Sequence, residues 1–131
     1  MTTAIDKTAE TENIRRETTP LPYSDITPET LPDLLLKKMP MILDMRDSVA
    51  FESGHISGAV QADETEIRQI LARRSRPVLV YCYHGHSSRD LAEFLSRMGV
   101  QEVYNLEGGW HALQGIAGKT ITTAVEVSTC H

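Results

Sequence analysis

The sequence signal for the fold is most evident in Pro77-Val78-Leu79-Val80-Tyr81-Cys82-Tyr83-His84-Gly85-His86-Ser87-Ser88, where an apolar run leads directly into a polar loop. The apolar run, residues 77–81, is typical of a buried strand. Residues 90–98 then predict a helix, with Ser87 and Asp90 as a capping box and Gly99 as its C-terminal stop. The apolar face of this helix should carry Leu91, Phe94, Leu95 and Met98.

The rest of the chain continues this alternation of strands and helices. Short apolar segments predict strands at 23–26, 41–44 and 103–106. Helices are predicted at 28–38, at 64–74 and directly after Gly108-Gly109-Trp110, ending near Gly115 or Gly118. Residues 45–57 are polar and show no regular period. The alternation predicts an α/β fold, with a central parallel sheet and helices on both faces.

Length and composition favour one compact domain with a tail at each end. The chain has 131 residues, of which 40% are hydrophobic and 24% charged, and this composition allows a substantial core. We predict a flexible tail at 1–20 and a folded domain at 21–118. Residues 119–131 are predicted to be either a second tail or an extra strand.

Charge and hydropathy argue against several classes of function and location. The formal net charge of −5 disfavours a nucleic-acid binder that depends on a basic surface. No apolar run approaches the roughly 18 residues that a membrane helix needs, and residues 1–19 contain no apolar signal-peptide stretch. We therefore expect a cytoplasmic protein in which both cysteines, Cys82 and Cys130, are reduced thiols.

Cys82 stands where a reactive thiol is expected in such a sheet, because ligands bind at the carboxyl ends of the strands in open α/β folds. A short polar loop can turn its N–H groups toward one centre, and the following helix adds the positive end of its dipole. Both effects lower the pKa of a thiol and favour an anionic substrate. A buried structural cysteine would be the simpler interpretation, but it has no need of this polar loop. The candidate loop residues are Tyr83, His84, Gly85, His86, Ser87 and Ser88.

Four motifs, in the same order, resemble those of one known family. Cys82-Tyr83-His84-Gly85-His86-Ser87 resembles the active-site loop of rhodaneses, and most closely the Cys-Tyr-His-Gly-x-Ser loop of short single-domain bacterial thiosulfate sulfurtransferases. The other three motifs are Leu43-Asp44-Met45-Arg46, Gly54-His55-Ile56-Ser57-Gly58-Ala59 and Leu106-Glu107-Gly108-Gly109. The resemblance covers roughly residues 23–118 and implies the rhodanese-like three-layer α/β fold.

The resemblance implies a thiosulfate sulfurtransferase. The Cys82 thiolate would take the sulfane sulfur of thiosulfate or a similar donor, and the resulting persulfide would pass that sulfur to a thiophilic acceptor. The acceptor would be cyanide in vitro and a thiol or a sulfur-carrier protein in vivo, and no metal or organic cofactor is needed. Asp44 and Arg46 would support the loop, and Arg89 would add charge at its rim. His55 is expected to be structural, and His111 and His131 to be surface residues.

Three other interpretations of the Cys82 loop are open. A persulfide carrier that uses thiosulfate poorly is one, because Tyr83 stands where long two-domain rhodaneses usually have Arg. A phosphatase is a remote alternative, since related phosphatases need an Arg at the position that Ser88 occupies here. A zinc site formed by Cys82, His84 and His86 is disfavoured, because Gly85 interrupts any extended segment. Cys130 is expected to be an incidental thiol, the alternative being a relay partner of Cys82.

Overall fold

The computed structural model describes residues 22–116 and 127–128. The predicted N-terminal tail, residues 1–20, lies outside the described residues. So do Cys130, His131 and all of 119–131 other than residues 127–128.

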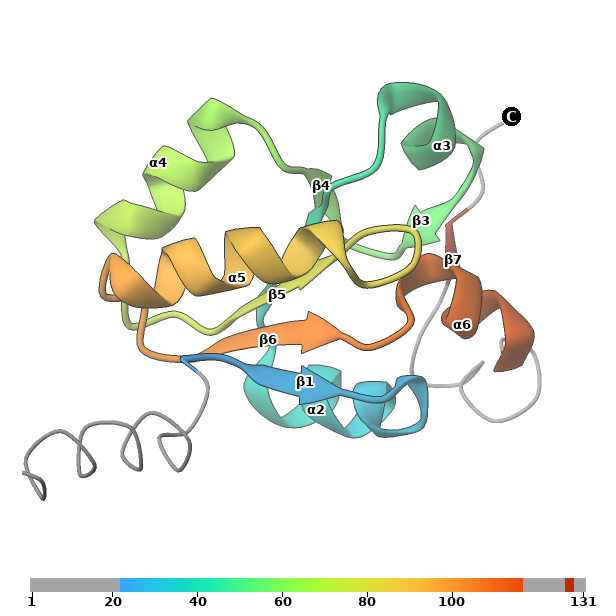
Figure 1. Ribbon diagram of the computed structural model, residues 1–131, viewed down its shortest axis with the longest axis horizontal. Coiled ribbons are helices and arrows are strands. Elements are labelled where there is room, and N and C mark those ends of the chain that lie inside the picture. The colour runs from blue at the N-terminus through green and yellow to red at the C-terminus, as the bar shows by residue number, and fades with distance from the viewer. Residues whose placement is uncertain (1–21, 117–126, 129–131) are drawn as a thin grey trace, which may run out of the picture.

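The centre of the molecule is a five-stranded sheet in which every neighbouring pair is parallel (Figure 1). Its strands are β1 (Ser24–Ile26), β2 (Met41–Asp44), β4 (Val60–Gln61), β5 (Val78–Tyr81) and β6 (Val103–Leu106). They are arranged in the order β1-β6-β5-β2-β4, so the strand before Cys82 is the central one. The predicted parallel sheet is confirmed, and its most apolar strand is the one buried along its whole length.

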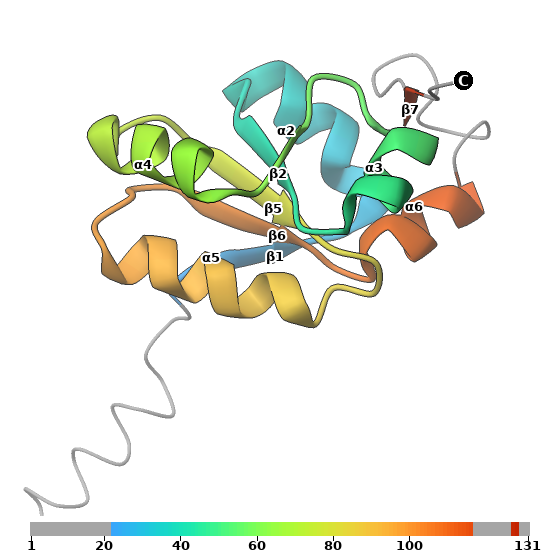
Figure 2. The same ribbon diagram turned by 90° about the horizontal axis from the view of Figure 1, so that it is seen from above.

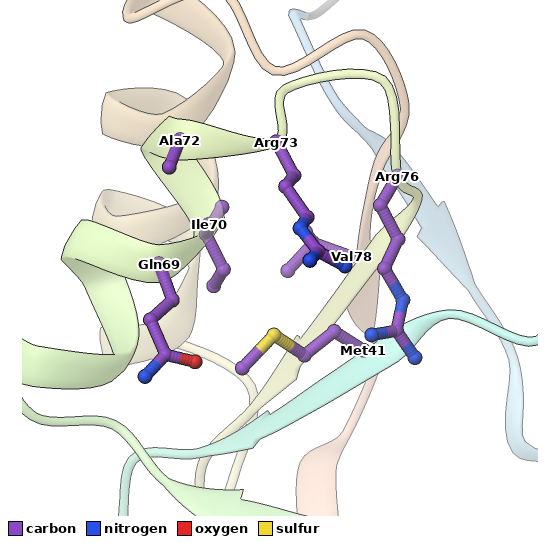
Figure 3. Close-up of a pocket in the computed structure, with 7 residues that line it drawn as sticks. All are labelled: Met41, Gln69, Ile70, Ala72, Arg73, Arg76 and Val78. Carbon is purple, nitrogen blue, oxygen red and sulfur yellow. The ribbon is translucent and has the colours of Figure 1, made fainter.

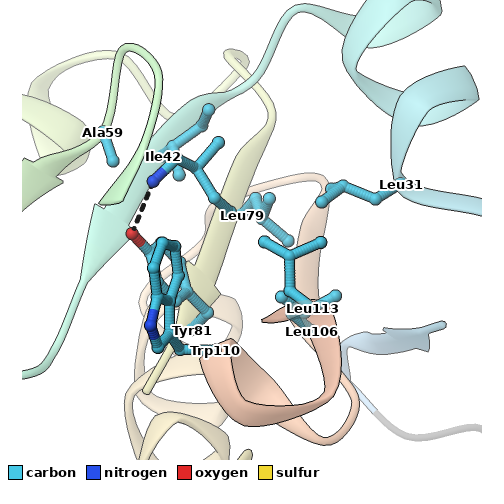
Figure 4. Packing of buried hydrophobic residues seen from close by; sticks show 9 residues of the cluster. Leu31, Ile42, Ala59, Leu79, Tyr81, Leu106, Trp110 and Leu113 are labelled. Carbon is cyan, nitrogen blue, oxygen red and sulfur yellow. Dashed lines mark hydrogen bonds between the residues drawn. The ribbon is translucent and has the colours of Figure 1, made fainter. Parts of the chain in front are cut away.

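Helices cover both faces of the sheet, as predicted, and α2 and α5 lie on opposite sides of it in Figure 2. On one face, Val78 and Val80 of β5 pack with Ile70 and Leu95. On the other face, Leu79 and Tyr81 pack with residues such as Trp110 (Figure 4). The helices are η1 (Pro28–Thr30, a 3-10 turn), α2 (Leu31–Lys38), α3 (Ser48–Ser53), α4 (Glu64–Ala72), α5 (Ser87–Arg97) and α6 (Gly109–Ile116).

The segment 45–57 is more regular than the sequence indicates. It contains the short helix α3 and the strand β3 (His55–Ile56), which pairs antiparallel with β7 (Val127–Ser128). The Asp47 carboxylate begins α3 by accepting a hydrogen bond from the Ala50 N–H at 2.8 Å. A six-residue helix with no buried residue has no apolar period for the sequence to show.

Helix α5 begins earlier than predicted, and its buried face is different. Its first residue is Ser87 and its N-cap is His86, so the Ser87–Asp90 capping box is wrong. The buried positions are Ser88, Ala92 and Leu95, while Phe94 and Met98 of the predicted apolar face are 45% and 42% exposed. The helix therefore presents a different face to the core from the predicted one, because Ser88 holds its first turn against Cys82. The predicted stop at Gly99, with φ of +100°, is confirmed.

Among the described residues, no helix has both the length and the apolar character needed to cross a membrane.

Candidate active site

Cys82 directly follows the central strand β5, and the loop after it curls around its sulfur. The Gly85 N–H donates to Cys82 Sγ at 3.0 Å, and the Ser88 N–H approaches it at 3.4 Å. The Ser88 hydroxyl lies 3.3 Å from the same sulfur. The thiol is 7% exposed and therefore depends on these groups, not on water, for its polar contacts. This is the concave arrangement of N–H donors that the polar loop predicts.

Burial raises the pKa of the Cys82 thiol, but hydrogen bonds outweigh this effect and hold the pKa below its ordinary value. The largest of these contributions comes from the Ser88 side chain, followed by the N–H groups of Ser88, Gly85 and Ser87. Each of these donors stabilises the thiolate more than the thiol. The loop thus favours the nucleophilic form of Cys82.

Asn105 in strand β6 extends the polar contacts of the site and was not singled out from the sequence. The Ser88 hydroxyl also lies within hydrogen-bond distance of Asn105 Oδ1, so its single hydrogen is directed either to that oxygen or, when the thiol is ionised, to Cys82 Sγ. Asn105 Nδ2 in turn donates to Asp25 Oδ1 at 2.9 Å and lies 3.5 Å from the Gly85 carbonyl oxygen. Asn105 is fully buried, so these contacts satisfy an amide that would otherwise be costly to bury. The available signal was a polar residue inside an otherwise apolar strand.

The Gly108-Gly109 motif fixes the loop from the other side. The N–H groups of Trp110 and His111 donate to the carbonyl oxygens of Cys82 and Tyr83 at 2.8 and 2.9 Å. Gly109 has a φ of +62°, and a Cβ there would lie 2.4 Å from the Cys82 carbonyl oxygen. Only glycine permits backbones to approach this closely. The start of α6 therefore acts as a clamp on the Cys82 loop.

Asp44 and Arg46 form a buried ion pair beside the loop. Arg46 Nη2 lies 2.7 Å from Asp44 Oδ2, and the side chains are 5% and 0% exposed. The same Nη2 donates to the Gly54 carbonyl oxygen at 2.6 Å, and the guanidinium stands 4.3 Å from the centre of the Trp110 ring. The pair thus joins the end of β2 to the segment before β3 and to α6. The pair reaches the Cys82 loop through Trp110, whose N–H donates to the Cys82 carbonyl oxygen, and the supporting role of Asp44 and Arg46 stays a prediction.

An open cavity of about 440 Å³ lies over Cys82. Its lining residues are Met45, Arg46, Asp47, Ala50, Cys82, Tyr83 and Ser87. Arg46 is the only cation among them, and Asp44 already pairs with it. Because Asp47 also lines the cavity, the side chains supply no net positive charge, and the attraction for an anion comes from the loop N–H groups.

Of the other candidate residues, Tyr83 and Ser87 line this cavity, and His84, His86 and Arg89 do not. The side chains of Tyr83, His84 and His86 are exposed, and the rings of His84 and His111 lie 5.3 Å apart. His55 packs its ring on Phe51 at 3.9 Å and contacts the Phe51 carbonyl oxygen through Nδ1, contacts that fit the structural role expected for it. Arg89 is exposed in the first turn of α5, where its charge offsets part of the rise that burial and nearby carboxylates cause in the pKa of Tyr23. Within the described ranges, no three His, Cys, Asp or Glu side chains gather as a metal site.

Replacing Ser88 by alanine is expected to slow alkylation of Cys82 by iodoacetamide at neutral pH by roughly tenfold, since a hydrogen bond to a charged group contributes about 1.5–3 kcal/mol. The rates should converge at high pH, because the lost donor raises the pKa of the thiol and leaves the thiolate reactive. The matched control is Ser87→Ala, in which the exposed side chain is removed and the N–H is kept. Equal pH profiles for the two variants would contradict this assignment.

Three comparisons place the chain among known proteins. A family model described as "Rhodanese-like domain" matches residues 27–115. The chain is similar to the thiosulfate sulfurtransferase GlpE of Pseudomonas putida, with 37% identity over 90 residues, or 67% of this chain and 82% of the relative. It is also similar to the thiosulfate sulfurtransferase GlpE of Shewanella oneidensis, with 39% identity over 79 residues, or 56% of this chain and 78% of the relative. A solved structure, the rhodanese-like domain of the Alr3790 protein from Anabaena sp., matches with a TM-score of 0.61 and 28% identity, covering 74% of this chain and 76% of that one.

Proposed function

The chain belongs to the rhodanese-like domain family, and from this membership we propose that it transfers sulfane sulfur from thiosulfate through a persulfide on Cys82. Its activity is that of a thiosulfate sulfurtransferase, the activity named for the GlpE relatives that it matches at 37% and 39% identity. One observation carries the persulfide proposal. Cys82 Sγ is a buried sulfur toward which the N–H groups of Gly85 and Ser88 both point.

In the first half-reaction, the Cys82 thiolate attacks the outer sulfur of thiosulfate. A bond forms between Cys82 Sγ and that sulfur, while the S–S bond of thiosulfate breaks and its electron pair leaves with sulfite. The product is a Cys82 persulfide anion, so the total charge is unchanged and no outside oxidant or reductant takes part. This is covalent catalysis, in which one transfer is divided into two displacements.

The loop has further N–H groups for the charge of the persulfide. The terminal sulfur would extend about 2 Å beyond Sγ and would carry a negative charge that needs donors of its own. Among the described residues, the N–H groups of His84 and His86 donate to no protein acceptor. We assign them to the terminal sulfur, since N–H donors turned toward one concavity favour an anion.

In the second half-reaction, a thiophilic acceptor attacks the terminal sulfur and the Cys82 thiolate leaves. Cyanide gives thiocyanate, and a thiolate gives a new persulfide. We propose a thiol or a sulfur-carrier protein as the acceptor in the cell, because the cavity over Cys82 is open and Tyr83 at its edge is 45% exposed. A reducing compartment such as the cytoplasm suits this chemistry, since it keeps Cys82 from being lost to a disulfide.

A persulfide carrier that uses thiosulfate poorly is the second candidate. The observation in its favour is that the only cation lining the cavity, Arg46, is already paired with Asp44. A phosphatase is less well supported, because Ser88 is fully buried and bonded within the protein at the position where that chemistry needs an arginine clamp.

The test treats the wild-type protein with thiosulfate, measures its intact mass and then adds cyanide. A gain of the mass of one sulfur atom, followed by steady formation of thiocyanate, is the expected result. Added sulfur with little turnover on thiosulfate would favour the carrier. A protein that gains no sulfur and forms no thiocyanate would refute the proposal, and release of phosphate from an aryl phosphate would indicate the phosphatase.

A further inference from the structure

A second cavity, of about 270 Å³, lies at the opposite end of the parallel strands from Cys82. It lies between the last turn of α4 and the first residues of β2 and β5, and its lining residues are Met41, Gln69, Ile70, Ala72, Arg73, Arg76 and Val78 (Figure 3). Val78 begins β5, whereas Cys82 follows its last residue. The two cavities thus lie at the two ends of one strand and share no lining residue.

The charges at this second cavity differ from those of the rest of the domain. Every lysine and arginine in residues 22–116 forms a salt bridge except Arg73, Arg74, Arg76 and Arg89. Two of these four, Arg73 and Arg76, line this cavity, and Figure 3 shows both side chains extending toward the strands that carry Met41 and Val78. The chain as a whole carries a formal charge of −5. Both side chains are exposed and have no carboxylate partner among the described residues, so their guanidinium groups are available to an anion from solution.

The other residues that line the cavity indicate what the rest of a bound ligand should be. Ile70 and Val78 are buried apolar side chains beneath the arginines, and the Met41 thioether lies beside them. The Gln69 amide stands across from the guanidinium groups in Figure 3. The carbonyl end of α4 carries partial negative charge, which two full positive charges more than offset. An apolar floor with a few converging polar groups is the usual form of a small-molecule site.

We propose that this cavity binds a small organic anion, with its carboxylate or phosphate between Arg73 and Arg76 and its apolar part on Ile70 and Val78. Guanidinium groups hold such oxyanions in bidentate fashion. The volume lies below the range of about 300–1,000 Å³ typical of drug-sized ligands, so the ligand is no larger than a substituted ring. Inorganic anions lack the apolar part that the floor would cover. The site does not depend on the chemistry of Cys82.

The test titrates the full-length protein with phenylphosphonate and with benzoate, and follows its backbone amide signals by NMR. Saturable shifts at the end of α4 and the start of β5 are expected, separate from any shift in the Cys82 loop. Comparison of the two probes distinguishes phosphate-like from carboxylate ligands. Inorganic phosphate should bind at least about tenfold more weakly, since burial of the ring contributes about 25 cal/mol per Å².

Two double variants with the same change in net charge complete the test. Arg73→Gln/Arg76→Gln should weaken binding by roughly tenfold or more, because two charge-assisted contacts are lost. Arg68→Gln/Arg97→Gln removes two arginines that pair with Glu64 and Glu93 on exposed surfaces, and it should leave the affinity unchanged. If both variants weaken binding of the probes equally, the loss of affinity comes from the change in net charge alone, and the proposal is overturned. Absence of saturable binding to the wild type, or equal binding of inorganic phosphate, would overturn it as well.

Discussion

Replacing Cys82 by serine is expected to reduce sulfur transfer from thiosulfate to cyanide by at least roughly a thousandfold, to the background rate, as removal of a covalent nucleophile does in other enzymes. A serine hydroxyl remains protonated at neutral pH, so no nucleophilic anion forms under the Gly85 and Ser88 N–H groups. Intact mass after treatment with thiosulfate should show no added sulfur. Because serine is similar in shape and keeps a polar atom among these donors, the thermal midpoint should stay close to that of the wild type.

The matched control is Cys130→Ser, which removes the other cysteine of the chain. It should form thiocyanate at the wild-type rate, since the proposed mechanism needs one thiol. Residual transfer in Cys82→Ser with sulfur on Cys130 would contradict the assignment of the nucleophile. A Cys82–Cys130 disulfide in the wild type would indicate instead that the second thiol has a relay role.

The strands of this fold are readable from sequence because burial on both faces leaves a continuous apolar run. Val78 and Val80 pack on one face of the sheet and Leu79 and Tyr81 on the other, so no polar residue interrupts β5. Such runs predict the parallel sheet and place Cys82 at the end of a buried strand, which the structure shows to be the central one. The glycine in the loop and the helix after it then predict N–H donors around the thiol, which the structure contains.

Features that depend on contacts between distant segments could not be predicted in this way. The start of α5 is set by the approach of Ser88 to Cys82 and Asn105 and not by a local capping pattern. Asn105 itself comes from β6, and its contact with Asp25 spans 80 positions of the chain. The Gly108-Gly109 motif is visible in the sequence, but the backbone that Gly109 touches is known only from the fold.

Replacing Gly109 by alanine is expected to lower the free energy of unfolding by roughly 2–5 kcal/mol, the sum of a left-handed backbone cost and overpacking. The new Cβ would lie 2.4 and 2.6 Å from the carbonyl oxygens of Cys82 and Tyr83. The loop can yield only by losing the hydrogen bonds from Trp110 and His111. Sulfur transfer should therefore fall in the fraction that remains folded, because the N–H groups around Cys82 move with the loop. Urea unfolding gives the first quantity, and thiocyanate formation well below the unfolding midpoint gives the second.

The matched control is Gly58→Ala, which measures the free-energy cost of the left-handed backbone conformation without the clash expected in Gly109→Ala. Gly58 also has a positive φ, +88°, but a Cβ there would meet no atom within 4 Å. This variant should lose only the roughly 1–2 kcal/mol of the left-handed conformation and retain full sulfur transfer. The difference between the two variants measures how tightly the start of α6 holds the Cys82 loop. Equal losses of stability, together with unchanged transfer in Gly109→Ala, would mean that the loop keeps its shape without this clamp, and that Ser88 and the turn at Gly85 suffice to hold the donors around the sulfur.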